Sequence, residues 1–191
     1  MTTTDDDAIT VQQDRHRVIL LVGFMGAGKT SVGRALAKRL HRRFLDLDEV
    51  VVAREGRSIA EIFSQSGEEG FRVRESAALQ ELLRELEQTS DKAVVALGGG
   101  SLMQQVNRDS VSASRFPVIF LDSSPEELFR RCRAQDLARP LLNDLHAFQD
   151  LYRSRQAHYA GLGTRLDTTG TSADEVCNQI QRSLALAEEK H

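Results

Sequence analysis

Short, mostly apolar runs alternate with longer stretches of mixed polarity along this chain. Runs of this length, bounded by polar or turn-forming residues, are typical of strands buried inside a sheet. The runs that predict strands are Val18–Val22, Phe44–Asp46, Ala93–Leu97, Pro117–Leu121 and a shorter one at Arg165–Asp167.

The stretches between these runs have apolar residues at helical spacing, as Val32, Leu36 and Leu40 illustrate. Helices are predicted over Ser31–Leu40, within Glu49–Leu86, over Pro125–Cys132 and over Ala173–Ala187. Strands that alternate with helices predict an α/β fold, in which a parallel sheet is covered by helices on both faces. Ligands of such sheets bind at the carboxyl ends of the strands.

Three segments fall outside this alternation. Residues 47–88 predict a helical insertion after the second strand, and residues 133–147, charged and interrupted by Pro140, favour a mobile lid. Residues 1–17 are polar and acidic, so we expect a flexible arm there, followed by a single domain over residues 18–191.

Composition limits the possible partners of the chain. It has 191 residues, of which 40% are hydrophobic, with a net charge of −3, so nucleic acid is not expected as the main partner. No apolar run reaches the roughly 20 residues that cross a membrane, and the N-terminus resembles no targeting signal. Cys132 and Cys177 have no metal or redox spacing. We expect a cytoplasmic protein, and a monomer.

The first candidate site follows the first predicted strand. Gly23–Thr30 reads GFMGAGKT and has the G-x-x-x-x-G-K-[ST] spacing of a phosphate-binding P-loop between a strand and a helix. In this motif, backbone N–H groups at the start of the helix surround the phosphates. Lys29 reaches the β- and γ-phosphates, and the Thr30 hydroxyl ligates Mg²⁺. The predicted nucleotide-binding residues are Gly26, Ala27, Gly28, Lys29, Thr30 and Ser31.

Carboxylates end two other predicted strands. Asp46 and Asp48 close the second strand and could divide the work of holding Mg²⁺ and activating an acceptor hydroxyl, although Asp48 could instead cap a helix. Asp122 ends the apolar run from Val118 and is a rival for the metal, because it resembles a Walker-B carboxylate. The residue pattern alone leaves these alternatives open.

Arginines and glycines supply candidates for binding an acceptor. Arg72 and Glu75 lie three positions apart in a predicted helix, where the carboxylate can orient the guanidinium to bind an anion. Gly98–Gly100 follow a strand, which suggests a close approach of ligand or backbone. Arg139 on the predicted lid and Arg155 are further candidates for binding anions.

Taken in order, these motifs resemble those of the shikimate kinase family. The resemblance runs from about Val18 to Ala187, and it rests on the segments GFMGAGKT, FLDLD, SIAEIFSQSGEEGFRVRE, LGGG and RPLL and on an arginine four residues before a tyrosine. It implies a nucleoside-monophosphate-kinase fold with three αβα layers, a five-stranded parallel sheet, a substrate-binding insertion and a lid. It also implies transfer of phosphate from ATP, with Mg²⁺, to the 3-hydroxyl of shikimate in aromatic amino acid biosynthesis.

The resemblance further implies a role for each matching residue. Asp46 would hold Mg²⁺ with Thr30, in preference to Asp122, and Asp48 would be the catalytic base. The remaining implied site residues are Lys29 and Arg139 for phosphate transfer, Thr171 for the nucleotide, and Arg72, Gly98, Gly99, Gly100 and Arg155 for shikimate.

Some positions depart from the family pattern. The predicted lid is one residue short before RPLL, so either Arg131 or Arg133 would stack on adenine. Ala173 and His158 stand where the family often has proline. Two other functions compete with shikimate phosphorylation: a kinase for gluconate or another polyol, and a nucleotide-binding regulatory protein without activity.

Overall fold

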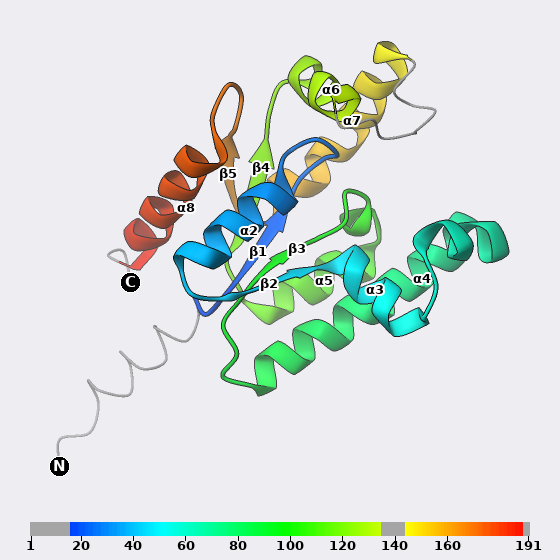
Figure 1. Ribbon diagram of the computed structural model, residues 1–191, viewed down its shortest axis with the longest axis horizontal. Coiled ribbons are helices and arrows are strands. Elements are labelled where there is room, and N and C mark those ends of the chain that lie inside the picture. Colours follow the sequence, from blue (N-terminus) through cyan, green and yellow to red (C-terminus); the bar gives the residue numbers. More distant parts are fainter. Residues whose placement is uncertain (1–15, 135–143, 189–191) are drawn as a thin grey trace.

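The computed structural model describes residues 16–134 and 144–188 of the chain, and these fold around a five-stranded sheet (Figure 1). The strands are β1 (Val18–Val22), β2 (Arg43–Asp46), β3 (Ala93–Ala96), β4 (Val118–Asp122) and β5 (Thr164–Asp167). Their order is β2-β3-β1-β4-β5, and every neighbouring pair is parallel. The predicted parallel α/β sheet is therefore confirmed.

Helices cover both faces of this sheet. They are α2 (Lys29–Arg39), α3 (Leu47–Glu55), α4 (Ile59–Gln88), α5 (Gln105–Ser114), α6 (Pro125–Ala134), α7 (Leu145–Ala160) and α8 (Ala173–Glu188), with a 3₁₀ turn, η1, at Ser101–Met103. Helices α2 and α8 pack together, as do α4 and α5 (Figure 1). Right-handed crossovers place these two pairs on opposite faces of the sheet, which gives three layers.

The centre of the sheet forms the core. All five residues of β1 are buried, as are those of β3 and β4 next to it. Strands buried on both faces read as continuous apolar runs, which explains why the sequence located β1 residue for residue. The edge strands β2 and β5 are more exposed and carry more polar residues.

The predicted insertion of residues 47–88 contains α3 and α4. Helix α4 is kinked at Gly67, where φ is +65°. Beyond this kink α4 buries an apolar side in the core, formed by Phe71, Ala78, Leu79, Leu82, Leu83 and Leu86. The larger part of α4 is thus a crossover helix that returns the chain to β3. The part before Gly67 projects from the body of the molecule (Figure 1).

Helices α5 and α7 were not predicted as helices from the sequence. Of the predicted lid, residues 135–143 lie outside the described residues, and Arg139 lies there too. The described part of the predicted lid comprises the end of α6 and the start of α7. No helix within the described ranges is both long enough and apolar enough to cross a membrane.

Candidate functional site

The P-loop runs from the end of β1 into α2. Gly26 and Gly28 both have positive φ, +79° and +87°, which glycine adopts without strain. Gly28 caps α2 without a side-chain hydrogen bond, so no capping side chain competes with a phosphate for the first N–H groups of this helix. Lys29 lies across the loop and donates from Nζ to the carbonyl oxygens of Gly23, at 2.7 Å, and of Phe24, at 3.0 Å.

The carboxylate of Asp46 joins this loop to the end of β2. Thr30 Oγ1 lies 3.1 Å from Asp46 Oδ2, so the two predicted metal ligands are neighbours. The other oxygen of Asp46 accepts from the backbone N–H of Asp48 at 3.1 Å, which makes Asp46 the N-cap of α3. Asp48 is therefore not the capping residue, as the sequence had allowed, but lies in the first turn of α3.

Asp122, the rival for the metal, does not fit that role. Its side chain is 2% exposed, and both of its oxygens have protein partners. Oδ1 accepts from the Tyr152 hydroxyl at 2.8 Å, and Oδ2 accepts from Arg165 Nε and Nη2 at 2.8 and 2.7 Å. The carboxylate at the end of this Walker-B-like strand thus forms an ion pair with Arg165.

Arg72 of α4 lies near the turn that follows β3, and carboxylates of its own helix hold its guanidinium. It donates from Nη1 to Glu75 at 2.8 Å and from Nη2 to Glu68 at 3.1 Å. Burial opposes the charge, but the bonds to Glu75 and Glu68 raise the pKa of Arg72. Glu75 is fully buried and accepts a second bond, at 2.5 Å, from Ser101 Oγ.

The glycine run after β3 passes close to these side chains. A Cβ atom on Gly100 would lie 2.4 Å from Arg72 Nη2, and one on Gly98 would lie 2.6 Å from Glu75 Oε1 and 3.1 Å from Asp48 Oδ1. A side chain at either position would displace the ends of these charged side chains. The sequence suggested a close approach of ligand or backbone to this run, and in the structure the side chains of Arg72, Glu75 and Asp48 approach it.

Helix α7 brings two more side chains to the same turn. Arg155 Nη1 donates to the carbonyl oxygen of Gly99 at 3.2 Å, and the Tyr159 hydroxyl donates to the same oxygen. Burial raises the pKa of Tyr159 to about 12, so the hydroxyl remains a donor at neutral pH. Arg155 also lies 5.8 Å from the ring centre of Phe24 in the P-loop. The acceptor residues and the phosphate loop therefore meet at Gly99.

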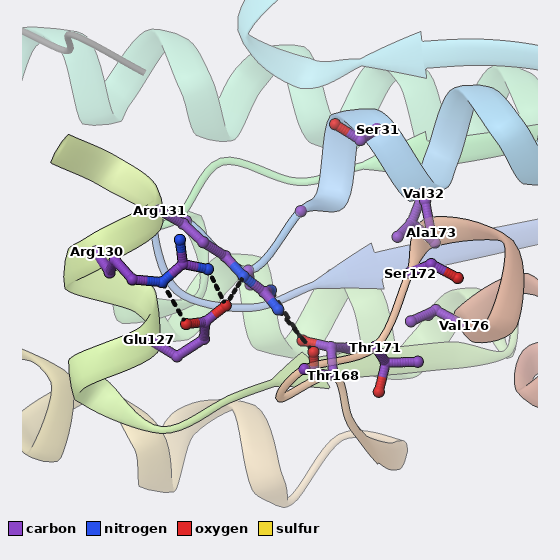
Figure 2. Close-up of a pocket in the computed structure, with 14 residues that line it drawn as sticks. Ser31, Val32, Glu127, Arg130, Arg131, Thr168, Thr171, Ser172, Ala173 and Val176 are labelled. Carbon is purple, nitrogen blue, oxygen red and sulfur yellow. Dashed lines mark hydrogen bonds and ion pairs between the residues drawn. The ribbon is translucent and has the colours of Figure 1, made fainter. Parts of the chain in front are cut away.

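A pocket of about 500 Å³ lies on the other side of the P-loop (Figure 2). Its walls come from the P-loop, α6 and the loop between β5 and α8, and they include the predicted residues Gly26, Ala27, Gly28, Ser31 and Thr171. Arg131 extends into this pocket, whereas Arg133 packs against the ring of Phe129 at 5.9 Å. Of the two arginines that the sequence left open, the structure thus places Arg131 at the pocket.

Glu127 is a pocket residue that the sequence interpretation missed. It accepts from Arg131 Nε at 2.8 Å and from both Nε and Nη2 of Arg130 (Figure 2). Arg130 first, and then Arg131, lower the pKa of Glu127 to about 2 against the effect of burial. Arg131 also donates to the Thr168 carbonyl at 2.7 Å. Its guanidinium is therefore held from two sides. The i, i+3 and i+4 spacing of these three charges was the available signal.

We expect Glu127→Gln to weaken nucleotide binding because Arg131 loses a charged partner. The KM for ATP should rise about three- to tenfold with little change in kcat, as judged by steady-state kinetics. Glu126→Gln, one position earlier, is the matched control, since Glu126 pairs with Gln149 rather than with an arginine. Equal KM values for ATP in both variants would contradict this role of Glu127.

Comparisons with known proteins identify the family. A sequence model described as "Shikimate kinase" matches residues 25–185. The shikimate kinase of Symbiobacterium thermophilum is 41% identical over 171 residues, 87% of this chain and 95% of that protein. A solved shikimate kinase of Acinetobacter baumannii in complex with shikimate superposes with a TM-score of 0.79 at 35% identity, covering 91% of this chain and 96% of that one.

A gluconokinase structure from Sinorhizobium meliloti shares the fold more distantly. Its TM-score is 0.61 at 18% identity, with 93% of this chain and 95% of that chain covered, and such a likeness shows the fold alone. The family model and relatives of about 40% identity each span most of the chain. The chain belongs to the shikimate kinase family.

Proposed function

We propose that this chain transfers the γ-phosphate of ATP to the 3-hydroxyl of shikimate, a step of aromatic amino acid biosynthesis. One observation carries the choice of acceptor: Arg72, Arg155 and Asp48 converge on the glycine turn beside the P-loop. Shikimate has a carboxylate and several hydroxyl groups, which match two guanidinium groups and a carboxylate.

In the proposed reaction, Asp48 accepts the proton of the attacking hydroxyl. The hydroxyl oxygen forms a bond to the γ-phosphorus in line with the bond that breaks, and ADP leaves with that electron pair. Lys29 and the N–H groups of Gly26, Ala27, Gly28 and Ser31 bind the phosphates. Because little covalent chemistry is asked of the protein, positioning and charge neutralisation supply most of the rate.

The residues present fit a magnesium ion. Thr30 and Asp46 offer oxygen atoms, the ligands that Mg²⁺ prefers, and their side chains lie 3.1 Å apart next to the P-loop. These two residues would hold the ion, Asp46 through water. Bound Mg²⁺ would neutralise charge on the β- and γ-phosphates.

The acceptor would be held from two helices. Arg72 of α4 and Arg155 of α7 bind its carboxylate, and the backbone of Gly98–Gly100 contacts its ring substituents. Thr171 in the pocket wall contacts the nucleotide, and Arg139 would stabilise the transferring phosphate from a lid near residues 133–147. Of the arm predicted over residues 1–17, residues 1–15 lie outside the described residues, and Arg17 at its end is buried and donates to the backbone carbonyls of Glu87 and Asp91. The monomeric state and the cytoplasmic location belong to the same proposal.

A coupled assay of ADP release tests the acceptor. With Mg²⁺ and ATP, release should depend on shikimate and should be far slower with quinate or gluconate. Faster release with gluconate would favour the polyol-kinase alternative. ATP binding without release for every acceptor would favour the regulatory protein.

A further inference from the structure

Asp122 is a buried carboxylate that the proposed reaction does not use. Removing a carboxylate from water is unfavourable unless charged or hydrogen-bonding partners compensate it. Here the compensation comes from two different elements: Tyr152 of α7 bonds Oδ1, and Arg165 of β5 bonds Oδ2 with two nitrogens. The last residue of β4 is thus joined to the elements on either side of the site.

On the nucleotide side, Asp122 fixes the end of β5. Besides the ion pair with Arg165, its backbone carbonyl accepts from the N–H of Thr168 at 2.8 Å and from the Thr168 hydroxyl at 2.9 Å. The carbonyl of Thr168 in turn accepts from Arg131 in the pocket (Figure 2). The backbone of Asp122 thus holds the residue whose carbonyl Arg131 binds, and its carboxylate holds the preceding strand through Arg165.

On the acceptor side, Asp122 fixes α7. Tyr152 is buried, and its ring lies edge-on to Phe24 of the P-loop at 5.6 Å between ring centres. Burial and the neighbouring Asp122 raise the pKa of Tyr152, so its hydroxyl stays a donor to that carboxylate. Arg155 follows three residues later, on the same side of α7. The bond from Tyr152 thus anchors the turn of α7 that carries Arg155.

We propose that Asp122 is a positioning residue that aligns the two halves of the site, Arg155 through Tyr152 and Arg131 through Arg165 and Thr168. The identity of the two substrates rests on the proposed function. Asp122 itself touches neither of them. Its effect should therefore appear in the binding of both substrates rather than in the chemical step, for which Lys29 and Asp48 come from other elements.

Four variants separate these links in steady-state kinetics. Tyr152→Phe should raise the KM for shikimate about fivefold and leave the KM for ATP within twofold. Arg165→Met should raise the KM for ATP about fivefold and leave the KM for shikimate within twofold. Asp122→Asn should raise both KM values about fivefold, while kcat changes less than threefold. Arg165→Lys, which retains the charge, should recover part of the loss for ATP.

Asp150→Asn on α7 is the control, because its exposed carboxylate pairs, among the described residues, with Arg153 of the same helix. If Asp122→Asn lowers the melting temperature and leaves both KM values unchanged, Asp122 is merely structural and the proposal fails. If Asp122→Asn does not fold, two other variants test the proposal: Tyr152→Phe should raise mainly the KM for shikimate, and Arg165→Met mainly the KM for ATP. Equal changes of both KM values in both variants would overturn the proposal. Calorimetric titration of the unaltered chain with shikimate tests the proposed function separately.

Discussion

Asp48→Asn should lose most of the turnover of this kinase while still binding ATP. Asparagine preserves the shape of the side chain but does not accept the proton of the attacking hydroxyl, so kcat should fall about 10²- to 10⁴-fold. The P-loop and the pocket beside it do not include Asp48, so the affinity for ATP should stay within about threefold of the original. Single-turnover kinetics and calorimetry measure the two quantities.

Glu49→Gln provides the matched control for this change. Glu49 is the next residue of the same helical turn, and its exposed side chain pairs with Arg34. Its loss of charge should leave kcat nearly unchanged, which would separate removal of a base from a general weakening of the first turn of α3. Turnover of Asp48→Asn close to that of Glu49→Gln would exclude Asp48 as the base.

Arg72→Lys should weaken binding of the acceptor far more than binding of the nucleotide. Lysine keeps the charge, but it does not keep the planar set of donors that binds Glu75 and, in the proposed function, would bind the substrate carboxylate as well. We expect the KM for shikimate to rise about 30- to 100-fold, with the KM for ATP within about twofold. Steady-state kinetics with each substrate varied in turn gives both values.

Arg74→Lys is the control for the same substitution in the same helix. Arg74 binds Glu55 of α3 and the carbonyl oxygen of Gly70 rather than residues of the glycine turn. Its replacement should leave the KM for shikimate almost unchanged. A similar loss in both variants would mean that α4 as a whole, and not the guanidinium of Arg72, determines acceptor binding.

The sequence located the parts of the site whose signals are local. A buried strand, glycines and Lys29 in one run are sufficient to predict the P-loop, since the backbone conformation follows from neighbouring residues. Strand ends that meet at one edge of a sheet made Asp46 a candidate partner of Thr30, the family resemblance favoured it over Asp122, and the two side chains lie 3.1 Å apart. The predicted strands were likewise close to those observed.

Contacts between distant residues were beyond the sequence. The strand ending in Asp122 looked like a metal site because nothing in the chain indicates that Tyr152 and Arg165, 30 and 43 residues away, occupy its oxygens. Tertiary packing determines those contacts. Helix α7, by contrast, does carry a local signal, because Phe148, Tyr152 and Tyr159 follow helical spacing, and it was missed because its first residues were assigned to the predicted lid.

The shared hydrogen-bond acceptor at Gly99 has a consequence for engineering. Arg155 and Tyr159 both donate to this carbonyl, about 60 residues before them in the chain. Grafting residues 47–88 from a kinase with another acceptor would therefore exchange Arg72 and Asp48 but retain the contribution of α7. Redesign for a new acceptor would therefore have to exchange α7 together with residues 47–88, since the acceptor site draws side chains from both.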